Sequence, residues 1–340
     1  MQPLRKVISK LKLRASYGQV GNANLGGRRF AYLSTITDDY ETLNMYKWGL
    51  DSSYGLTGMA EGEFAVQDLT WEIVNKMNLG VELGFLNGMI DLQLDYFDER
   101  RKDIFMPRES VPMTAGFMKQ PWKNFGKVTN QGVEVSLNVN KQFGKDLFVS
   151  LMGTFTYAHN EITEKDEPSA VVGTNRAETG HPVGQLTGYI AEGLFTADDF
   201  EDVSTGKLKE GIPTQSFVGK LRPGDIRYRD VNGDGKVDVF DKSPIGGTKD
   251  PEIVYGFGLN MKYKDLDFGA LFQGIGRSWN ILGSSIIPGA NRGVTGNMFT
   301  NANDRWTVDN PSQDVFYPRL DDGINSNNNQ PSVSYTHLTL

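Results

Sequence analysis

The sequence contains no cysteine and only three histidines in 340 residues. The absence of cysteine excludes a disulfide scaffold, a cysteine-ligated zinc or iron–sulfur site and a thiol nucleophile. The histidines, His159, His181 and His337, are too scattered for an HExxH pair. The sequence therefore gives no support for imidazole-based catalysis.

Clustered positive charge and long apolar runs are missing as well. Lys and Arg number 35 against 42 Asp and Glu, a formal net charge of −7, and no basic block is present that could bind a phosphate backbone. No apolar run approaches the ~20 residues of a transmembrane helix, and Met1-Gln2-Pro3 begins no signal peptide. These absences exclude a nucleic-acid binder and a helical membrane protein. A membrane barrel is not excluded, because each of its strands needs only ~9–11 residues.

What the sequence does contain is an alternating pattern. Glycine (39 residues) and aromatic residues (11%) are plentiful while hydrophobic content is only 38%, which is typical of β-rich proteins with long polar loops. In seven segments apolar side chains take every second position, as in strands with one apolar and one wet face. These segments are 11–18, 77–85, 90–96, 133–140, 149–157, 255–263 and 266–272.

The connections between these segments alternate between short and very long. Three are tight and have hairpin chemistry, at residues 86–88, 143–146 and 264–265. The long ones cover roughly residues 21–72, 101–128, 160–252 and 277 onward, far beyond the usual ~4–6 residues. Outer-membrane barrels have short periplasmic turns and long outer loops, so the pattern predicts an all-β, partial antiparallel transmembrane β-barrel with long extracellular loops.

A soluble β-sandwich or jelly roll is the alternative, since its strands also alternate with a period of two. Nothing in a sandwich requires short turns at one end and long connections at the other. Aromatic residues at the predicted strand ends, such as Tyr17, Phe85, Tyr96 and Tyr157, also resemble the girdles at a membrane interface. Seven strands are too few to close a large barrel, so the chain is interpreted as part of one.

The most specific local motif spans residues 230–241 and has the spacing of a calcium loop. Oxygen donors fall at positions 1, 3, 5, 9 and 12, a backbone carbonyl can serve position 7, and Gly235 stands at position 6, where the loop must turn sharply. The predicted ligands are Asp230, Asn232, Asp234, Lys236 (through its carbonyl), Asp238 and Asp241. Position 12 is Asp where an EF-hand has Glu, and no helical pattern precedes the loop. We predict a structural Ca²⁺ ion here, and a metal-free, solvated Asp/Gly turn is the alternative.

Two weaker candidates concern aromatic and acidic residues outside the predicted strands. Trp48, Trp122, Trp279 and Trp306 could stack on a sugar ring, or could simply pack against their own loops. The acidic residues of 161–167 could pass for a catalytic carboxylate group, although a charge run after a strand is usually a solvated face. No credible catalytic constellation is present, and we expect no enzyme.

Short landmarks along the chain resemble the SusC/RagA-type TonB-dependent outer-membrane transporters. Each is weak alone, but they follow in family order over roughly residues 10–320. The landmarks are residues 11–18, 21–22, Leu69-Thr70-Trp71-Glu72, 78–80, 85–88, 95–97, 130–134, 182–185, 188–189, 193–195, Pro223-Gly224-Asp225-Ile226, 245–246, 251, 255–256 and 305–312.

The resemblance implies a barrel of about 22 strands around an N-terminal plug, of which this chain would be a C-terminal part. It also implies active import of oligosaccharides or peptides, energised by TonB, under a SusD-type surface lipoprotein that forms a lid. The expected location is the bacterial outer membrane. Residues 1–332 would form the barrel part, whereas residues 333–340 do not resemble the family and are expected to be a non-native tail.

In this interpretation the wet side of the strands lines the lumen and the apolar side meets lipid. The lumen-facing candidates are Arg14, Glu82, Asp91, Asp95 and Glu134. The substrate-binding residues are not identified. The alternative function is a soluble, calcium-stabilised β module for glycan binding or adhesion.

Overall fold

The computed structural model describes residues 7–37, 46–48, 54–56, 59–117, 119–217, 220–281, 300–320, 328 and 332–333. The chain divides into two compact units. We call the first the strand unit (Met1–Val172, Glu178–Val183 and Pro251–Gly276) and the second the loop unit (Gly173–Ala177, Gly184–Asp250 and Arg277–Leu340). None of the helices in the described part of the chain is long and apolar enough to cross a membrane.

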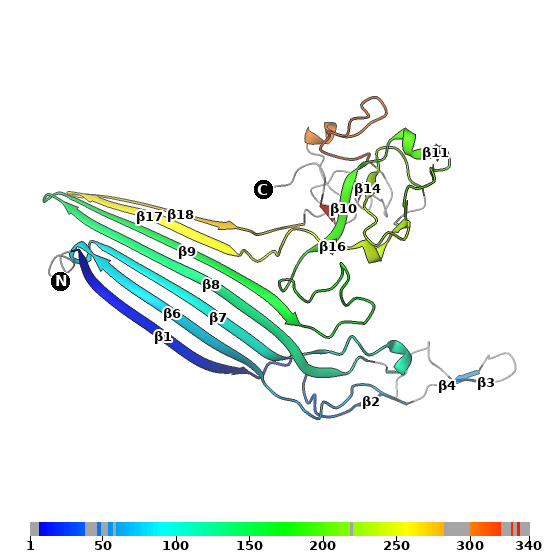
Figure 1. The fold of residues 1–340 in the computed structure, drawn as a ribbon, viewed down its shortest axis with the longest axis horizontal. Coiled ribbons are helices and arrows are strands. Elements are labelled where there is room, and N and C mark those ends of the chain that lie inside the picture. The colour runs from blue at the N-terminus through cyan, green and yellow to red at the C-terminus, as the bar shows by residue number, and fades with distance from the viewer. Residues whose placement is uncertain are drawn as a thin grey trace. The chain divides into compact units, whose positions relative to one another are not determined.

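The strand unit is built on one antiparallel sheet of seven long strands, which confirms all seven predicted segments (Figure 1). In sheet order the strands are β1 (Ile8–Asn22), β6 (Glu72–Phe85), β7 (Ile90–Pro107), β8 (Trp122–Phe143), β9 (Leu147–Glu164), β17 (Ile253–Tyr263) and β18 (Leu266–Gly276). The three tight connections all lie at one end of the sheet. The first includes a 3₁₀ turn, η2 (Leu86–Gly88), in which Asn87 has φ of 59°. At Lys264, in the last, φ is 53°.

The strands extend beyond the predicted segments at the end that carries the long connections. The expected loop 101–128 is wrong in its bounds, because β7 continues to Pro107 and β8 begins at Trp122, which leaves residues 108–121 as the connection. The loops expected at 21–72 and 160–252 likewise shorten, since β1 ends at Asn22 and β9 at Glu164. The alternating pattern stops earlier than the hydrogen bonding does.

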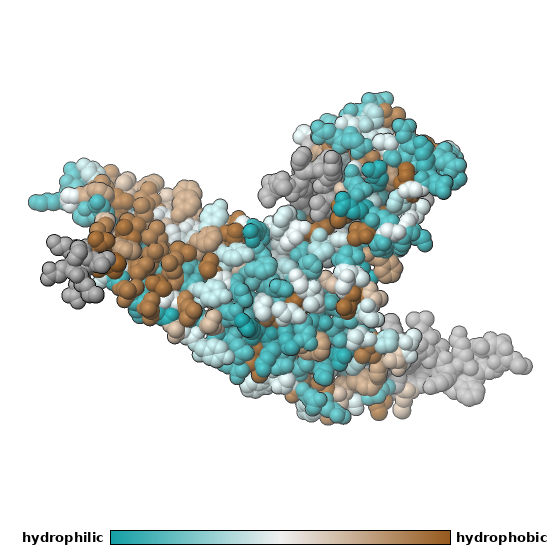
Figure 2. Space-filling model, viewed as in Figure 1, coloured by the Kyte–Doolittle hydropathy of each residue, from teal (hydrophilic) through white to brown (hydrophobic). Residues whose placement is uncertain are grey.

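The two faces of the sheet differ in chemistry. Pairing sets Leu13 beside Val81 and Val81 beside Leu94, and directly paired residues share a face. Large apolar side chains on this face are exposed, among them Leu11, Leu13, Leu79, Leu94, Leu137, Leu151, Phe155, Phe257, Phe268 and Phe272. We call them the apolar band; it runs from the Phe143–Leu147 pair to the row of Tyr96, Val133 and Tyr157. Figure 2 shows hydrophobic residues gathered over the tight-turn part of the sheet.

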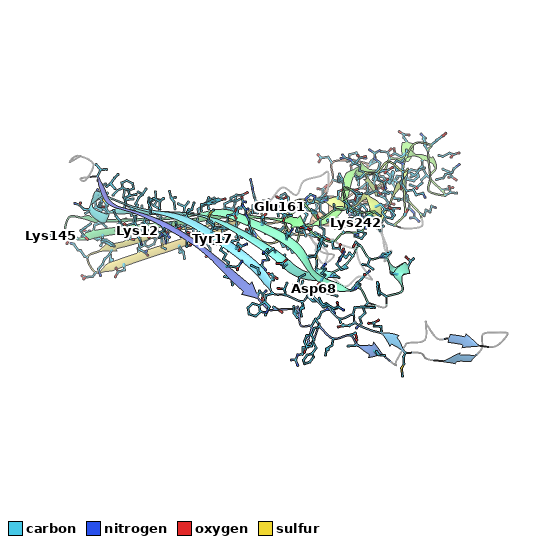
Figure 3. All side chains as sticks on the ribbon, turned by 60° about the horizontal axis from the view of Figure 1, so that its bottom comes forward. Lys12, Tyr17, Asp68, Lys145, Glu161 and Lys242 are labelled. Carbon is cyan, nitrogen blue, oxygen red and sulfur yellow. The ribbon has the colours of Figure 1, made fainter. Side chains whose placement is uncertain are left out.

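Beyond the Tyr96 row the same face becomes polar while the strands continue. The next two rows are Asp98, Gln131 and His159, followed by Arg100, Thr129 and Glu161. In Figure 3, Lys145 lies at the tight-turn end of the sheet, and Glu161 lies toward the other end. Toward the long connections, the face that carries the apolar band is therefore polar as well, and apolar and polar residues no longer alternate along the strands.

The loop unit has a small hydrophobic core of its own, and much of the long loop predicted over residues 160–252 is folded around short strands. Its main sheet consists of β14 (Ile226–Tyr228), β10 (Thr187–Leu194) and β16 (Ser243–Pro244), with β19 (Ser332–Val333) pairing parallel to β10. Tyr189, Ala191, Tyr228 and Val237 form one buried cluster, and Phe195, Phe200 and Leu221 form another. Of the expected non-native tail only Val333 is described; residues 334–340 lie outside the described residues.

Short pairs complete the described secondary structure. They are β2 (Ile36–Thr37) with β5 (Ala60–Glu61), β3 (Tyr46–Trp48) with β4 (Tyr54–Leu56), β11 (Phe200–Asp202) with β12 (Lys207–Leu208), and β13 (Thr214–Gln215) with β15 (Lys236–Val237). The 3₁₀ turns besides η2 are η3 (Met113–Ala115), η4 (Ala197–Asp199), η5 (Val239–Asp241) and η6 (Thr300–Asn303).

Candidate functional site

An ion pair crosses the middle of a strand on the polar face of the sheet. Arg14 on β1 donates from Nη2 to both carboxylate oxygens of Asp95 on β7, at 2.8 Å each. Strand β6 lies between them, and its residue in that row is Gly80. A Cβ on Gly80 would overlap the Asp95 carboxylate and lie 3.0 Å from Arg14 Nη2. The missing side chain is thus what lets the guanidinium reach across β6, and the Asp95 side chain is only 7% exposed.

A second carboxylate, Glu82, collects three cations from β1. Lys10 and Lys12 lie 2.7 Å and 3.2 Å from its two oxygens. Arg14 Nε lies 3.2 Å from Glu82 Oε1, close enough for an ion pair although no aligned hydrogen bond forms. The polar face therefore carries an interlocked charge network, and it is held by residues of three adjacent strands.

All five predicted lumen-facing residues lie on this one face. Asp95 pairs with Glu134 and, through Gly80, with Arg14. Glu82 on β6 and Asp91 on β7 stand an even number of residues from Gly80 and Asp95, so they share the same face. The prediction that these residues lie on a common side is confirmed. The sequence pattern did not reveal the role of Gly80, because its meaning depends on which strands lie on either side.

The calcium-like loop is folded by its own carboxylates. Asp230 accepts hydrogen bonds from the backbone N–H groups of Gly233 at 2.6 Å and Gly235 at 2.8 Å. Both glycines have positive φ, 74° and 82°, in the left-handed region that favours glycine. Asp234 accepts from the N–H of Lys236 at 2.9 Å. The sharp turn expected at position 6 is present.

The last carboxylate of the loop, Asp241, is fully buried. Its Oδ1 accepts from the N–H of Val231 and its Oδ2 from the N–H of Asp238, both at 2.8 Å. Asp238 in turn caps the η5 turn by accepting from the N–H of Phe240. Asp230 and Asp241, the first and last residues of the motif, therefore both accept hydrogen bonds from backbone N–H groups within residues 230–241.

The fit of this loop to a metal ion is mixed. The turn geometry agrees with a calcium loop, and the oxygens of Asp230 each accept a single backbone hydrogen bond, which leaves a second lone pair. Asp241 Oδ1, in contrast, accepts from the N–H groups of both Val231 and Asn232. Within the described residues, however, no three Asp, Glu or His side chains are grouped to hold an ion. An ion would have to rely on the Asn232 amide, the Lys236 carbonyl and water as well, or draw the carboxylates together.

The tryptophans considered for sugar stacking pack against protein where their side chains are described. Trp306 lies against Gly224 and Trp279 against Gly246, at both of which a Cβ would overlap the indole ring. Trp122 belongs to β8, not to a loop, and contacts both the Phe105 ring and the Arg28 guanidinium, whose carbon lies 4.1 Å from the ring centre. The Trp48 backbone is part of β3, and its side chain lies outside the described residues.

The loop unit is tied together by a buried carboxylate that the sequence pattern did not single out. Asp225 is 1% exposed and accepts from Arg319 Nε at 2.9 Å and Nη2 at 2.8 Å, and from Asn328 Nδ2 at 3.1 Å. Burial raises the pKa of Asp225, while the Arg319 guanidinium acts to lower it. Two of the family landmarks meet here, because Trp306 covers Gly224.

The acidic residues after β9 have structural roles. Asp166 accepts from Arg108 Nε at 2.9 Å and from the Ser110 hydroxyl at 2.9 Å. Burial opposes ionisation of Asp166, but these hydrogen bonds hold its pKa below the usual value. Glu167 accepts from the Glu178 N–H at 2.5 Å and the Thr179 hydroxyl at 2.8 Å. The expected solvated face is therefore wrong for Asp166 and Glu167, which are buried.

The comparisons with known proteins identify the family of this sheet. The family model described as "TonB dependent receptor-like, beta-barrel" matches residues 4–247. The chain belongs to this family. Its curated relatives include TonB-dependent receptor P26 of Formosa agariphila, 28% identical over 322 residues, which covers 92% of this chain and 30% of the relative. TonB-dependent receptor SusC of Bacteroides thetaiotaomicron is 29% identical over 280 residues, 77% of this chain and 24% of the relative.

Solved structures show the same fold. The RagAB peptide transporter aligns with a TM-score of 0.64 and 23% identity, covering 96% of this chain and 32% of that chain. A second RagAB structure, in the "open-open" state, also aligns with a TM-score of 0.64, at 22% identity. The chain spans about a quarter to a third of the length of the relatives it matches. The sheet is thus part of a SusC/RagA-type TonB-dependent receptor barrel.

Because the chain belongs to this family, the apolar band is the lipid-facing surface of an outer-membrane barrel. Along β9 the band runs from Leu147 to Tyr157, ten residue steps. At ~3.4 Å per step and a tilt of ~40°, these steps give a height of ~26 Å, close to the ~25 Å expected. Lys141 stands on this face near the tight-turn end, where a long side chain can reach the headgroups.

Proposed function

We propose that this chain forms part of the wall of an outer-membrane importer that takes up oligosaccharides or peptides with energy from TonB, under a SusD-type lipoprotein lid. The single observation that carries the proposal is the sheet itself, with a lipid-facing apolar band on one face and a charge network on the other. The RagAB neighbour is a peptide transporter, which supports the peptide alternative. No chemical step is part of this proposal.

The alternative of a soluble adhesion or glycan-binding module is disfavoured by the same face. Large side chains such as Leu13 and Phe257 are more than half exposed there, at 74% and 54%. A soluble sandwich would bury such a surface against a second sheet. Contiguous exposed apolar surface of this kind is typical of a face that meets a partner or lipid.

Uptake by whole cells tests the proposal. We expect cells with the full-length protein to accumulate a labelled oligosaccharide or peptide pool, and to lose this uptake when TonB is deleted. The control is a cell that lacks only this transporter, which should lose the same fraction of uptake. Uptake that continues without TonB would contradict energised import.

The orientation of the barrel can be tested separately with epitope tags. A tag inserted between Glu210 and Gly211, in the loop unit, is expected to be labelled on intact cells, because long connections face outward in these barrels. A tag between Lys264 and Asp265, in a tight turn, is expected to be labelled only after permeabilisation. The opposite result would invert the topology.

We also propose that the Asp230–Asp241 loop holds one structural Ca²⁺ ion. Four carboxylates within twelve residues repel one another unless screened, and Ca²⁺ accepts 6–8 oxygens in flexible geometry. With Asp at position 12 and no grouped triad of carboxylates, we expect weak binding, with a Kd of ~10⁻⁴–10⁻³ M, as in extracellular modules.

Calorimetry on the full-length protein measures this binding. We expect Asp230→Ala/Asp234→Ala to remove the calcium signal. The matched control is Asp202→Ala, which changes an Asp in the same unit that also accepts local hydrogen bonds, from Ser204 and Thr205. If wild type shows no binding at millimolar calcium, or if both variants bind equally, the loop is a metal-free turn.

A further inference from the structure

A groove lies on the outer face of the sheet at the upper limit of the apolar band. Its volume is about 300 Å³. Its lower wall comes from the last row of the band, Tyr96, Val133 and Tyr157, and its upper wall includes Gln131, His159 and Glu161. Strands β7, β8 and β9 all contribute, so the groove is built on rigid hydrogen-bonded backbone. We call it the boundary groove.

The position of the boundary groove determines what can reach it. The rows between the groove and the tight turns face hydrocarbon, and the rows toward the long connections are polar. The groove therefore lies at the level of the lipid headgroups. This surface is continuous with the lipid interface of the band. With the long connections facing outward, the level is that of the outer leaflet.

The composition of the groove favours a ligand with one apolar and one hydroxyl-rich side. The rings of Tyr96 and Tyr157 supply apolar area together with polar tips, as amphipathic aromatic residues do at membrane interfaces. Gln131, His159 and Glu161 add amide, imidazole and carboxylate groups that exchange hydrogen bonds with hydroxyls. A sugar ring has this two-sided character.

The charges around the groove argue against an anionic headgroup. Glu161 lines its upper wall with a carboxylate, and the nearby carboxylates of Asp98 and Glu252 each lie against a neighbouring side chain. Arg100 Nε lies 3.0 Å from Asp98 Oδ1, and His159 Nδ1 lies 2.6 Å from Glu252 Oε1. A phosphate placed here would meet unbalanced negative charge, whereas a neutral sugar would not.

We propose that the boundary groove binds the uncharged sugar headgroup of an outer-leaflet glycolipid, with the acyl chains lying along the apolar band below. The site is separate from the import path, because it opens on the lipid-facing side of the sheet. The inference depends on the outer-membrane location and on the outward direction of the long connections. It does not depend on which substrate is imported.

Native mass spectrometry of the full-length protein in detergent tests the site. The probes are glucosyl diacylglycerol, phosphatidylethanolamine and phosphatidylglycerol, each added at equal concentration. We expect wild type to retain glucosyl diacylglycerol at least tenfold better than either phospholipid. Tyr157→Ala and Gln131→Ala should each reduce that retention at least fivefold and leave phospholipid retention unchanged.

The matched control is Tyr263→Ala, which removes the same kind of ring from the opposite edge of the band. It should retain the glycolipid like wild type, and heat-modifiable gel mobility checks that every variant is folded. If Tyr157→Ala does not assemble, Gln131→Ala, which lies above the band, carries the test. Equal retention of all three lipids, preferential retention of phosphatidylglycerol, or equal loss in Tyr263→Ala would each overturn the proposal. Because the readout is lipid retention, its failure is distinct from a failure of import.

Discussion

Leu137→Arg is expected to prevent assembly of the full-length protein in the outer membrane. Leu137 lies near the middle of the apolar band on β8, two rows below Val133, and is partly exposed on the lipid-facing side. A guanidinium at the bilayer midplane costs ~2–4 kcal/mol, a large share of the stability of a membrane barrel. The measurement is the amount of folded, heat-modifiable protein in the outer-membrane fraction.

The matched control is the neighbouring residue on the same strand. Asn138 points to the polar face, where it is paired with Asp91, so Asn138→Arg should gain a favourable charge partner and assemble normally. The two substitutions introduce the same side chain one residue apart. Equal tolerance at both positions would refute the assignment of the two faces.

Gly224→Ala is expected to open the loop unit in the folded barrel. Gly224 has φ of 87°, which alone disfavours alanine, and its added Cβ would overlap the buried Trp306 ring. Forcing the indole aside should cost about 2 kcal/mol beyond the backbone strain, by analogy with other overpacked sites. When cleavage follows opening, that difference makes limited proteolysis of the loop unit roughly 30-fold faster than in a variant that carries the backbone strain alone.

Gly211→Ala separates packing from backbone strain. Gly211 has nearly the same φ, 85°, but nothing lies within 4 Å of a Cβ placed there. Its replacement should carry only the backbone cost of about 1 kcal/mol. If both variants are cleaved at the same rate, the contact between Gly224 and Trp306 does not stabilise the unit.

The sheet could be predicted from sequence wherever its two faces meet different surroundings. Alternation marks the strands from the tight turns up to Tyr96 and Tyr157, because one face is apolar only over that stretch. From Asp98 to Asp103 every residue is charged and from Ile104 to Pro107 every residue is apolar, so the period-two signal disappears although the ladder to β8 continues. The strand ends were therefore predicted too early, for a physical reason.

The loop unit was less accessible to sequence reasoning. Its core residues, such as Tyr189, Phe195 and Val237, come from short segments without a sustained period. The pairing of Asp225 with Arg319 joins residues 94 positions apart, and no local pattern reports such a contact. The turn at residues 230–241 was predictable in shape because its glycines and carboxylates act locally, whereas the grouping of its ligands depends on packing. Whether the loop binds calcium stays a prediction.

The extension of the strands beyond the apolar band determines how far the outer rim of this barrel wall lies from the membrane. Strand β7 continues eleven residue steps beyond Tyr96, to Pro107. At ~3.4 Å per step and a tilt of ~40°, this extension adds ~29 Å, about the height of the band itself. In the proposed orientation the outer rim of the barrel wall therefore lies well outside the membrane surface. A molecule approaching from outside would meet protein long before it reached the level of the headgroups. The lid proposed above, if seated on this rim, would open without displacing lipid.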